Sequence, residues 1–295
     1  MTGFKKKLLN DQFVFTVELT PPRGSDTVTM IQKIEELKDL VDAVNFTDNP
    51  SAKMRMCSMA ACKISLEKGL EPVLQMTCRD RNRIAIQSDL LGAHALGIRN
   101  LLLMTGDHPF LGDHKEAKPV YDIDSSLLIR LVNNLNKGID INGNRLNGKT
   151  SFFYGAVVNP NAEPIQPQLK RFEQKIRMGA KFFYTQMIFE IEKLERVVEY
   201  AEKFKVKIVA GIVIIKTKRM LKYLSSKVPG VTVPHWLTDK IEKLDDKDVQ
   251  KFGFDFATSA IYKIMDRKLS HGIHIMAISG TEEVGKLLNF LKTGI

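Results

Sequence analysis

Residues 101–109, LLLMTGDHP, carry four apolar residues directly into a polar turn that contains the acidic residue Asp107. A continuous apolar run of this kind is typical of a strand that is buried on both faces, as in parallel sheets. Gly106 before the aspartate and Pro109 after it allow the backbone to turn sharply. The stretch therefore predicts a buried strand whose end presents a carboxylate.

The same succession of an apolar strand and an amphipathic helix continues along the chain. The predicted strands span residues 13–19, 41–46, 71–77, 99–105, 151–158, 181–186, 207–215 and 272–278. Helices are predicted from about residue 27 and at 51–68, 81–96 (capped by Asp80), 123–137, 165–178, 190–204, 216–226, 247–268 and 281–293, with an extra short helix starting at Pro234. Eight such units in 295 residues favour a parallel α/β barrel, a single (βα)8 TIM barrel with extra helices, over an open sheet. Because no low-complexity linker interrupts the chain, we expect one domain over residues 1–295.

The composition is that of a globular protein with a basic surface. Hydrophobic residues make up 44% and charged residues 26%, and the formal net charge is +10. A positive field favours anionic partners, but the lysines are spread along the polar helix faces and form no basic stripe with interleaved aromatics, so nucleic acid is not expected. The three cysteines lack metal-ligand spacing, as do the six histidines, so no metal site is expected. With no signal peptide and no apolar run long enough to span a bilayer, we expect a cytoplasmic protein that does not enter a membrane.

Polar side chains follow the predicted strands at the ends where the chemistry of such barrels gathers. They include Glu18, Asn45, Thr47, Gln75, Thr77, Thr105, Asp107, Asn159, Thr185, Gln186 and the run Ser279-Gly280-Thr281. Any one of them alone is most simply a loop cap, but amides, hydroxyls and two carboxylates at successive strand ends favour a ligand site. Glu18 is the sharpest case, because it interrupts an apolar strand and so requires a partner or a function. The Ser279–Thr281 run is suited to present backbone N–H groups to a phosphate at a helix start.

Two other patterns do not predict function. GNRLNGKT (143–150) has the spelling of a phosphate-binding loop, but a helix precedes it and a strand follows, the reverse of the required order. Its Asn-Gly pairs are typical of turns. The chain also lacks the G-x-G-x-x-G pattern of a dinucleotide-binding fold.

Several of these segments resemble the methylenetetrahydrofolate reductase family. FTVELTPPRG (15–24) resembles the family's first strand with its glutamate and Pro-Pro-Arg turn, and TGDHP (105–109) resembles its fourth-strand Gly-Asp segment. AVVNPNAEP (156–164) and QKIRMGAKFFYTQ (174–186) are similar to its flavin- and folate-binding region, and VPGVTVPHWL (228–237) to its Pro-x-Trp segment. The resemblance covers the chain in order.

The resemblance implies a TIM barrel that holds a flavin (FAD or FMN) and reduces 5,10-methylenetetrahydrofolate to 5-methyltetrahydrofolate by hydride transfer. Glu18 would be the general acid that opens the folate ring to an iminium, and Asp107 would stabilise that cation and contact the pterin. Gln186 would bind the pterin as well. The implied flavin-binding residues are Thr47, Gln75, Thr105, Gly106, Tyr121, Asn159 and Lys175. Such an enzyme serves one-carbon metabolism, in methionine biosynthesis or the acetyl-CoA pathway.

The chain departs from the common bacterial pattern at several of these positions. Gln75 stands where a His is usual and Thr105 where an Arg is usual, while Met276 and Gly280 replace a Tyr and an Arg. These changes leave open the type of flavin and the electron donor, either NAD(P)H or a redox partner protein. QMTCRDRNR (75–83) looks more like the branch found in acetogenic and related anaerobes, which implies a possible zinc- or iron-sulfur-binding partner subunit. We also expect an oligomer.

Two alternatives remain from the sequence. One is a reductase that acts on a different pterin carrier. The other is a non-catalytic or assembly subunit of a one-carbon complex, against which the presence of both Glu18 and Asp107 argues.

Overall fold

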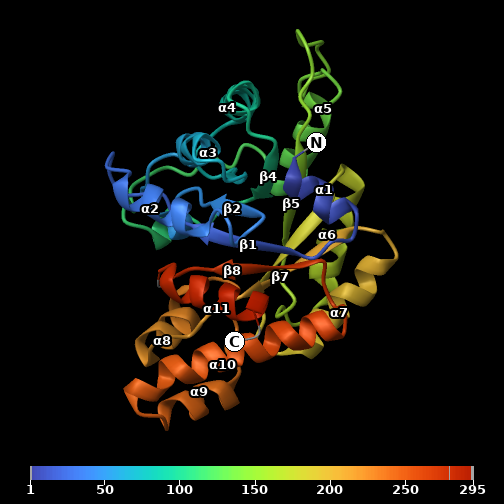
Figure 1. The fold of residues 1–295 in the computed structure, drawn as a ribbon. Coiled ribbons are helices and arrows are strands. Elements are labelled where there is room, and N and C mark those ends of the chain that lie inside the picture. Colours follow the sequence, from blue (N-terminus) through green and yellow to red (C-terminus); the bar gives the residue numbers. More distant parts are fainter. Residues whose placement is uncertain (1, 279, 294–295) are drawn as a thin grey trace.

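Eight parallel strands close into a barrel in chain order, with β8 hydrogen-bonded back to β1 (Figure 1). The computed structural model describes residues 2–278 and 280–293. The strands are β1 (Val14–Leu19), β2 (Ala43–Phe46), β3 (Pro72–Thr77), β4 (Asn100–Met104), β5 (Phe153–Val158), β6 (Phe182–Met187), β7 (Lys207–Ile212) and β8 (Gly272–Met276). The predicted (βα)8 barrel is therefore confirmed, and each strand lies within or next to its predicted segment.

Helices surround the strands, with α2, α3 and α4 on one side and α8, α10 and α11 on the other (Figure 1). The described helices are α1 (Gly3–Leu9), α2 (Val28–Leu37), α3 (Ser58–Glu67), α4 (Arg83–Ala95), α5 (Ser125–Leu135), α6 (Gln166–Met178), α7 (Ile191–Glu202), α8 (Lys218–Lys227), α9 (His235–Glu242), α10 (Asp246–Asp266) and α11 (Glu282–Thr293), with short 3₁₀ turns η1 (Pro50–Ala52) and η2 (Pro109–Leu111). The extra helix at Pro234 is confirmed as α9. None of the helices in this described part of the chain is both long and apolar enough to cross a membrane.

Two details of the predicted helices were wrong. The helix predicted at 51–68 begins only at Ser58, because Asn49, Ser51 and Ala52 have positive φ angles that an α-helix cannot contain. Helix α4 is capped by Asn82, whose side chain accepts hydrogen bonds from the N–H groups of residues 84 and 85. Asp80, the predicted cap, instead pairs with Arg79.

The interior of the barrel changes from apolar to polar along the strands. Side chains alternate in direction along a strand, so every second residue faces inward. Near the starts of the strands, the buried residues form an apolar cluster that includes Val14, Ala43, Val73, Phe153 and Phe182. Gly155 leaves room for the Phe182 ring, because a Cβ there would lie 2.5 Å from it. Farther along, buried polar residues replace this packing: Thr16, Asn45, Gln75, Thr47 and His274. The polar end is the one at which ligands bind in such barrels.

Helix α1, which the sequence did not predict, covers the apolar end of the barrel. Phe4 and Leu8 are fully buried among the inward-facing residues of the strands. The Phe4 ring lies 5.6 Å from that of Phe182, edge to face, and the Phe4 N–H donates to Glu71 at 3.0 Å. The helix therefore closes the end opposite the polar one.

We expect Phe4→Ala to lower the free energy of unfolding by about 3–5 kcal/mol, because it removes a buried ring and leaves a cavity. Lys6→Ala, on the exposed face of the same helix, is the control and should change stability by less than about 0.5 kcal/mol. Urea unfolding followed by circular dichroism measures both. Equal midpoints for the two variants would show that α1 does not contribute to the core.

Candidate active site

One cavity of about 1060 Å³ opens at the carboxyl ends of the strands. All of the site residues implied by the family resemblance except Tyr121 line it: Glu18, Thr47, Gln75, Thr105, Gly106, Asp107, Asn159, Lys175 and Gln186. Of the other predicted strand-end residues, Asn45 does not line it. Tyr121 lies behind the wall and donates its hydroxyl hydrogen to the carbonyl of Gly106 at 3.1 Å. The cavity is at the large end of the range for small-molecule sites, so it has room for a cofactor together with a substrate.

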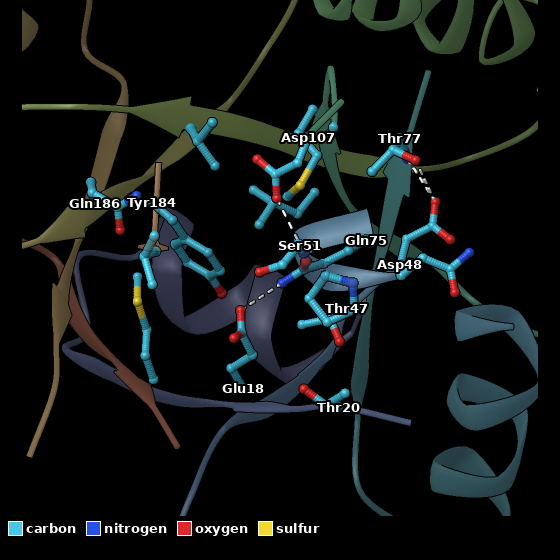
Figure 2. A pocket seen from close by; sticks show the side chains of 18 of the residues that line it. Glu18, Thr20, Thr47, Asp48, Ser51, Gln75, Thr77, Asp107, Tyr184 and Gln186 are labelled. Atoms are coloured by element: carbon cyan, nitrogen blue, oxygen red, sulfur yellow. Dashed lines mark hydrogen bonds between the residues drawn. The ribbon is translucent and has the colours of Figure 1, made fainter. Parts of the chain in front are cut away.

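Glu18 lies on β1 and points into this cavity (Figure 2). Its side chain is 26% exposed, and its Oε2 accepts a hydrogen bond from Gln75 Nε2 at 3.1 Å. His274 Nε2 lies 3.8 Å from the same oxygen. The carboxyl group is thus accessible from the cavity and is oriented by the Gln75 amide, with the His274 imidazole nearby.

His274 is held rigidly beneath Glu18. Its ring is buried and stacks on that of Tyr184, with centroids 4.6 Å apart and planes 9° from parallel. Its Nδ1 lies 3.0 Å from Thr16 Oγ1, whose hydroxyl donates to the carbonyl of Ile273 at 3.4 Å. The stack and this contact fix the orientation of the ring, so that Nε2 is the nitrogen that faces Glu18.

Asp107 is fixed by the loop that follows β2. Its Oδ2 accepts a hydrogen bond from the Ser51 N–H at 3.1 Å (Figure 2). Gly106 has a φ of +91°, and a Cβ there would lie 2.9 Å from Thr77, so the turn into Asp107 requires glycine. Positive φ angles at Ser51 and Ala52 mark backbone strain beside the same site. The carboxylate therefore has a defined position at the edge of the cavity.

Asp48 and Thr77 form a second fixed contact in the same wall (Figure 2). The Asp48 carboxylate, which is buried, accepts from both the N–H and the hydroxyl of Thr77 at 2.9 Å. Arg81 completes the arrangement with two further hydrogen bonds to Asp48. This carboxylate is fully engaged, and Asp124, which also lines the cavity, caps helix α5 by accepting from the Leu127 N–H.

The opposite wall carries a cation and two amides. Burial, with a smaller effect of Arg171, lowers the pKa of Lys175 to about 8, and its Nζ donates to the carbonyl of Val157 at 3.0 Å. Asn159 Nδ2 donates to the Gly230 carbonyl at 2.9 Å, and Gln186 Nε2 to that of Pro229 at 3.3 Å. The two amides hold the loop after α8 over this side of the cavity.

Two buried polar atoms at or near the wall have no partner among the described residues. Thr47 lines the cavity and is 2% exposed, and its hydroxyl makes no hydrogen bond to any described residue. The same holds for Nδ2 of the buried Asn45, which does not line the cavity. Buried polar groups are normally satisfied, so these atoms indicate a ligand or a water. Within residues 2–278 and 280–293, no three His, Cys, Asp or Glu side chains are arranged to hold a metal ion.

The run Ser279–Thr281, predicted to bind a phosphate, follows β8. Ser279 is outside the described residues. Gly280 and Thr281 line the cavity, and the Thr281 hydroxyl donates to Glu36 at 3.2 Å. Phosphate binding by the backbone of this run stays a prediction.

Comparison with known proteins agrees with the motifs. The model of the family described as methylenetetrahydrofolate reductase matches residues 4–292. The chain belongs to the methylenetetrahydrofolate reductase family. The family predicted from Glu18, Asp107 and their flanking residues is thus confirmed, whereas the branch resemblance stays a prediction.

Relatives are distant and mostly longer. A probable methylenetetrahydrofolate reductase (NADPH) of Caenorhabditis elegans is 24% identical over 95% of this chain and 42% of its own length. Methylenetetrahydrofolate reductase 2 of Schizosaccharomyces pombe is 26% identical over 78% of this chain and 38% of its own. The 5,10-methylenetetrahydrofolate reductase of Buchnera aphidicola is 22% identical over 78% and 74%. The chain thus spans less than half the length of the two eukaryotic relatives.

Solved structures support the fold alone. EDTA monooxygenase from Chelativorans sp. BNC1 has a TM-score of 0.58 at 9% identity, covering 96% of this chain and 94% of that one. Tryptophan synthase of Mycobacterium tuberculosis has a TM-score of 0.54 at 9% identity, covering 99% and 96%. Both similarities extend to the barrel fold and do not show a shared active site.

The sequence interpretation missed three residues of the site. His274 was counted only among histidines without metal spacing, and Tyr184 and Arg79 were not singled out. Their positions were the available indication, since His274 and Tyr184 each stand two residues before a strand-end residue, Met276 and Gln186, and so face the same interior.

Proposed function

We propose that this protein reduces 5,10-methylenetetrahydrofolate to 5-methyltetrahydrofolate with a hydride from a bound reduced flavin. The observation that supports it best is that Glu18 and Asp107 face one cavity of sufficient size in a chain of this family. We infer that residues 1–295 act as one flavin- and folate-binding domain. Flavin type, FAD or FMN, stays open.

The residues present suit a flavin. Thr47 offers an unused hydroxyl and Lys175 a cation, while Gln75, Thr105, Gly106 and Asn159 supply polar groups around the same cavity. Tyr121 supports the wall through Gly106. When bound, a flavin supplies the hydride chemistry, and the protein supplies orientation and charge.

The acid chemistry belongs to Glu18. Its carboxyl group delivers a proton to a ring nitrogen of the folate, so that the C–N bond breaks and the one-carbon bridge becomes an iminium that can accept a hydride. Gln75 orients the carboxyl group through its hydrogen bond, and His274 Nε2 lies 3.8 Å from the same oxygen. Asp48 is engaged by Thr77 and Arg81, and Asp124 caps helix α5 through the Leu127 N–H.

Asp107 stabilises the cationic folate intermediate, and both Asp107 and Gln186 bind the pterin. A fixed carboxylate near a developing cation lowers its energy without reorganisation. Asp107 is fixed through Oδ2 by Ser51, and Gln186 holds Pro229 through a long hydrogen bond that a pterin amide can replace. The electron donor, NAD(P)H or a redox protein, and the zinc- or iron-sulfur-binding partner subunit stay proposals from the family resemblance. Oligomerisation and the cytoplasmic location, which we expected from the sequence, stay proposals as well.

The test is a flavin titration of the purified protein. We expect one FAD or FMN to bind per chain without covalent attachment, seen as a shifted flavin absorbance. With an artificial electron carrier, the loaded protein should reduce methylenetetrahydrofolate and, in the reverse direction, oxidise methyltetrahydrofolate. Thr47→Val keeps the shape of the side chain but removes its hydroxyl, and should weaken flavin binding by about 2–10-fold. A colourless protein that takes up neither flavin contradicts the proposal.

A further inference from the structure

Both ends of the loop that carries Asp107 are hydrogen-bonded to one residue, Arg79, which lies just after β3. At the start of the loop, the Arg79 guanidinium donates from Nη1 to the main-chain carbonyl of Asp107 at 3.3 Å. At its far end, the N–H of Val120 donates to the Arg79 carbonyl at 2.7 Å. Arg79 therefore joins both ends of residues 107–120.

The guanidinium is held in one orientation. Arg79 is 2% exposed, and its Nε and Nη2 donate to the two oxygens of Asp80 at 2.8 and 2.7 Å. The planar fork of arginine can make this paired contact and still direct a third N–H elsewhere, which the ammonium of lysine cannot do in the same geometry. The direction of Nη1 toward Asp107 is therefore set by Asp80.

The ion pair of Arg79 with Asp80 keeps the buried guanidinium charged. Burial opposes the charge of Arg79, but the hydrogen bonds and negative charge of Asp80 outweigh it and raise the pKa of the guanidinium. Asp80 is in turn bonded by Asn49, at the start of the loop that supplies Ser51. Arg79 thus connects the backbone of Asp107 to the loop that fixes its carboxylate.

We propose that Arg79 is a positioning residue for Asp107, an inference that rests on the proposed function of Asp107. The Ser51 N–H fixes the carboxylate from one side and the Arg79 guanidinium fixes the carbonyl of the same residue from the other. Gly106 packs so closely against Arg79 that a Cβ at Gly106 would lie 3.2 Å from the Arg79 Cβ, and its positive φ of +91° marks a turn that glycine adopts freely. Without the guanidinium, this permissive turn would let Asp107 move from its position.

The first experiment needs neither flavin nor activity. Hydrogen exchange of the Ser51 amide, followed by NMR, reports its bond to Asp107. We expect Arg79→Lys to speed this exchange on the order of tenfold, because a bond to a charged acceptor is lost or loosened. Asp80→Asn, which frees the guanidinium without removing it, should act in the same direction. Unchanged exchange at Ser51 in both variants overturns the proposal.

The control breaks a neighbouring arginine–aspartate ion pair that also joins the segment after β3 to the segment after β4. Arg83 binds Asp122 through Nε at 2.7 Å, on the surface and away from Asp107. Arg83→Met should leave the Ser51 exchange within about twofold of the parent. Exchange of amides in β4 checks that each variant is folded. An equal effect of Arg83→Met would assign the change to general loosening of the loop and would also overturn the proposal.

The second experiment is a double-mutant cycle on folate reduction. A small misplacement of a catalytic group can cost up to about 100-fold. We expect Arg79→Lys to slow the reaction of reduced flavin with the folate by roughly 10–100-fold, but by less than about threefold when Asp107 is already Asn. Equal losses in both backgrounds would show that Arg79 acts directly on the ligand. If the parent protein itself does not reduce the folate, the proposed function fails, whereas the Ser51 exchange still tests the role of Arg79.

Discussion

Glu18→Gln is expected to lower methylenetetrahydrofolate reduction by roughly 10²–10⁴-fold, the usual contribution of a positioned general acid. Glutamine keeps the size of the side chain and can still accept the hydrogen bond that Gln75 donates to Glu18 at 3.1 Å. It cannot deliver a proton, so ring opening should fail while flavin binding persists. Stopped-flow reaction of the reduced protein with the folate measures the loss.

Two further measurements make this result specific. Reduction of the flavin by an artificial donor should remain within a few-fold of the parent, because it does not need the acid. Glu71→Gln is a matched control, since Glu71 lies just before β3 at the other end of the barrel, where it accepts from Asn100 Nδ2 and the Phe4 N–H. It should leave folate turnover close to that of the parent. Folate turnover within a few-fold of the parent in Glu18→Gln would show that another group is the acid.

The barrel and the position of the site could be predicted because both follow from local sequence. Each buried strand is a mostly apolar segment, and in parallel strands the residues at the carboxyl ends meet at one mouth. That rule placed Glu18, Thr47 and Gln75 at one mouth, and all three line the cavity. Their individual roles came from the family resemblance and not from strand order.

What could not be predicted depends on contacts between distant segments. Helix α1 has only Phe4 and Leu8 to bury, too little for a periodic pattern, and its place is set by Phe153 and Phe182, far along the chain. The left-handed backbone at Ser51 and Ala52 is not a preference of serine or alanine and is held by its surroundings, including the bond to Asp107. The stack of Tyr184 on His274 likewise joins two strands that are remote in sequence.

The last expected result concerns Asp107, whose charge we propose to act on both flavin and folate. Asp107→Asn should slow the folate half-reaction by roughly 10–10³-fold, the typical cost of losing one preorganised electrostatic group. Removal of a negative charge near the flavin should also favour its anionic reduced form and so raise the reduction potential. Reduction of the flavin by its donor should change much less.

The structure makes this substitution a test of charge more than of shape. The Ser51 N–H donates to Asp107 Oδ2 at 3.1 Å, and the Oδ1 of an asparagine can accept the same bond. Asp113→Asn is the control, because Asp113 lies on the same loop and holds Arg23 and the Met54 N–H without lining the cavity. It should leave the potential unchanged. If Asp107→Asn also leaves both the potential and the folate rate unchanged, Asp107 serves only to form the turn, a role that asparagine fulfils equally well.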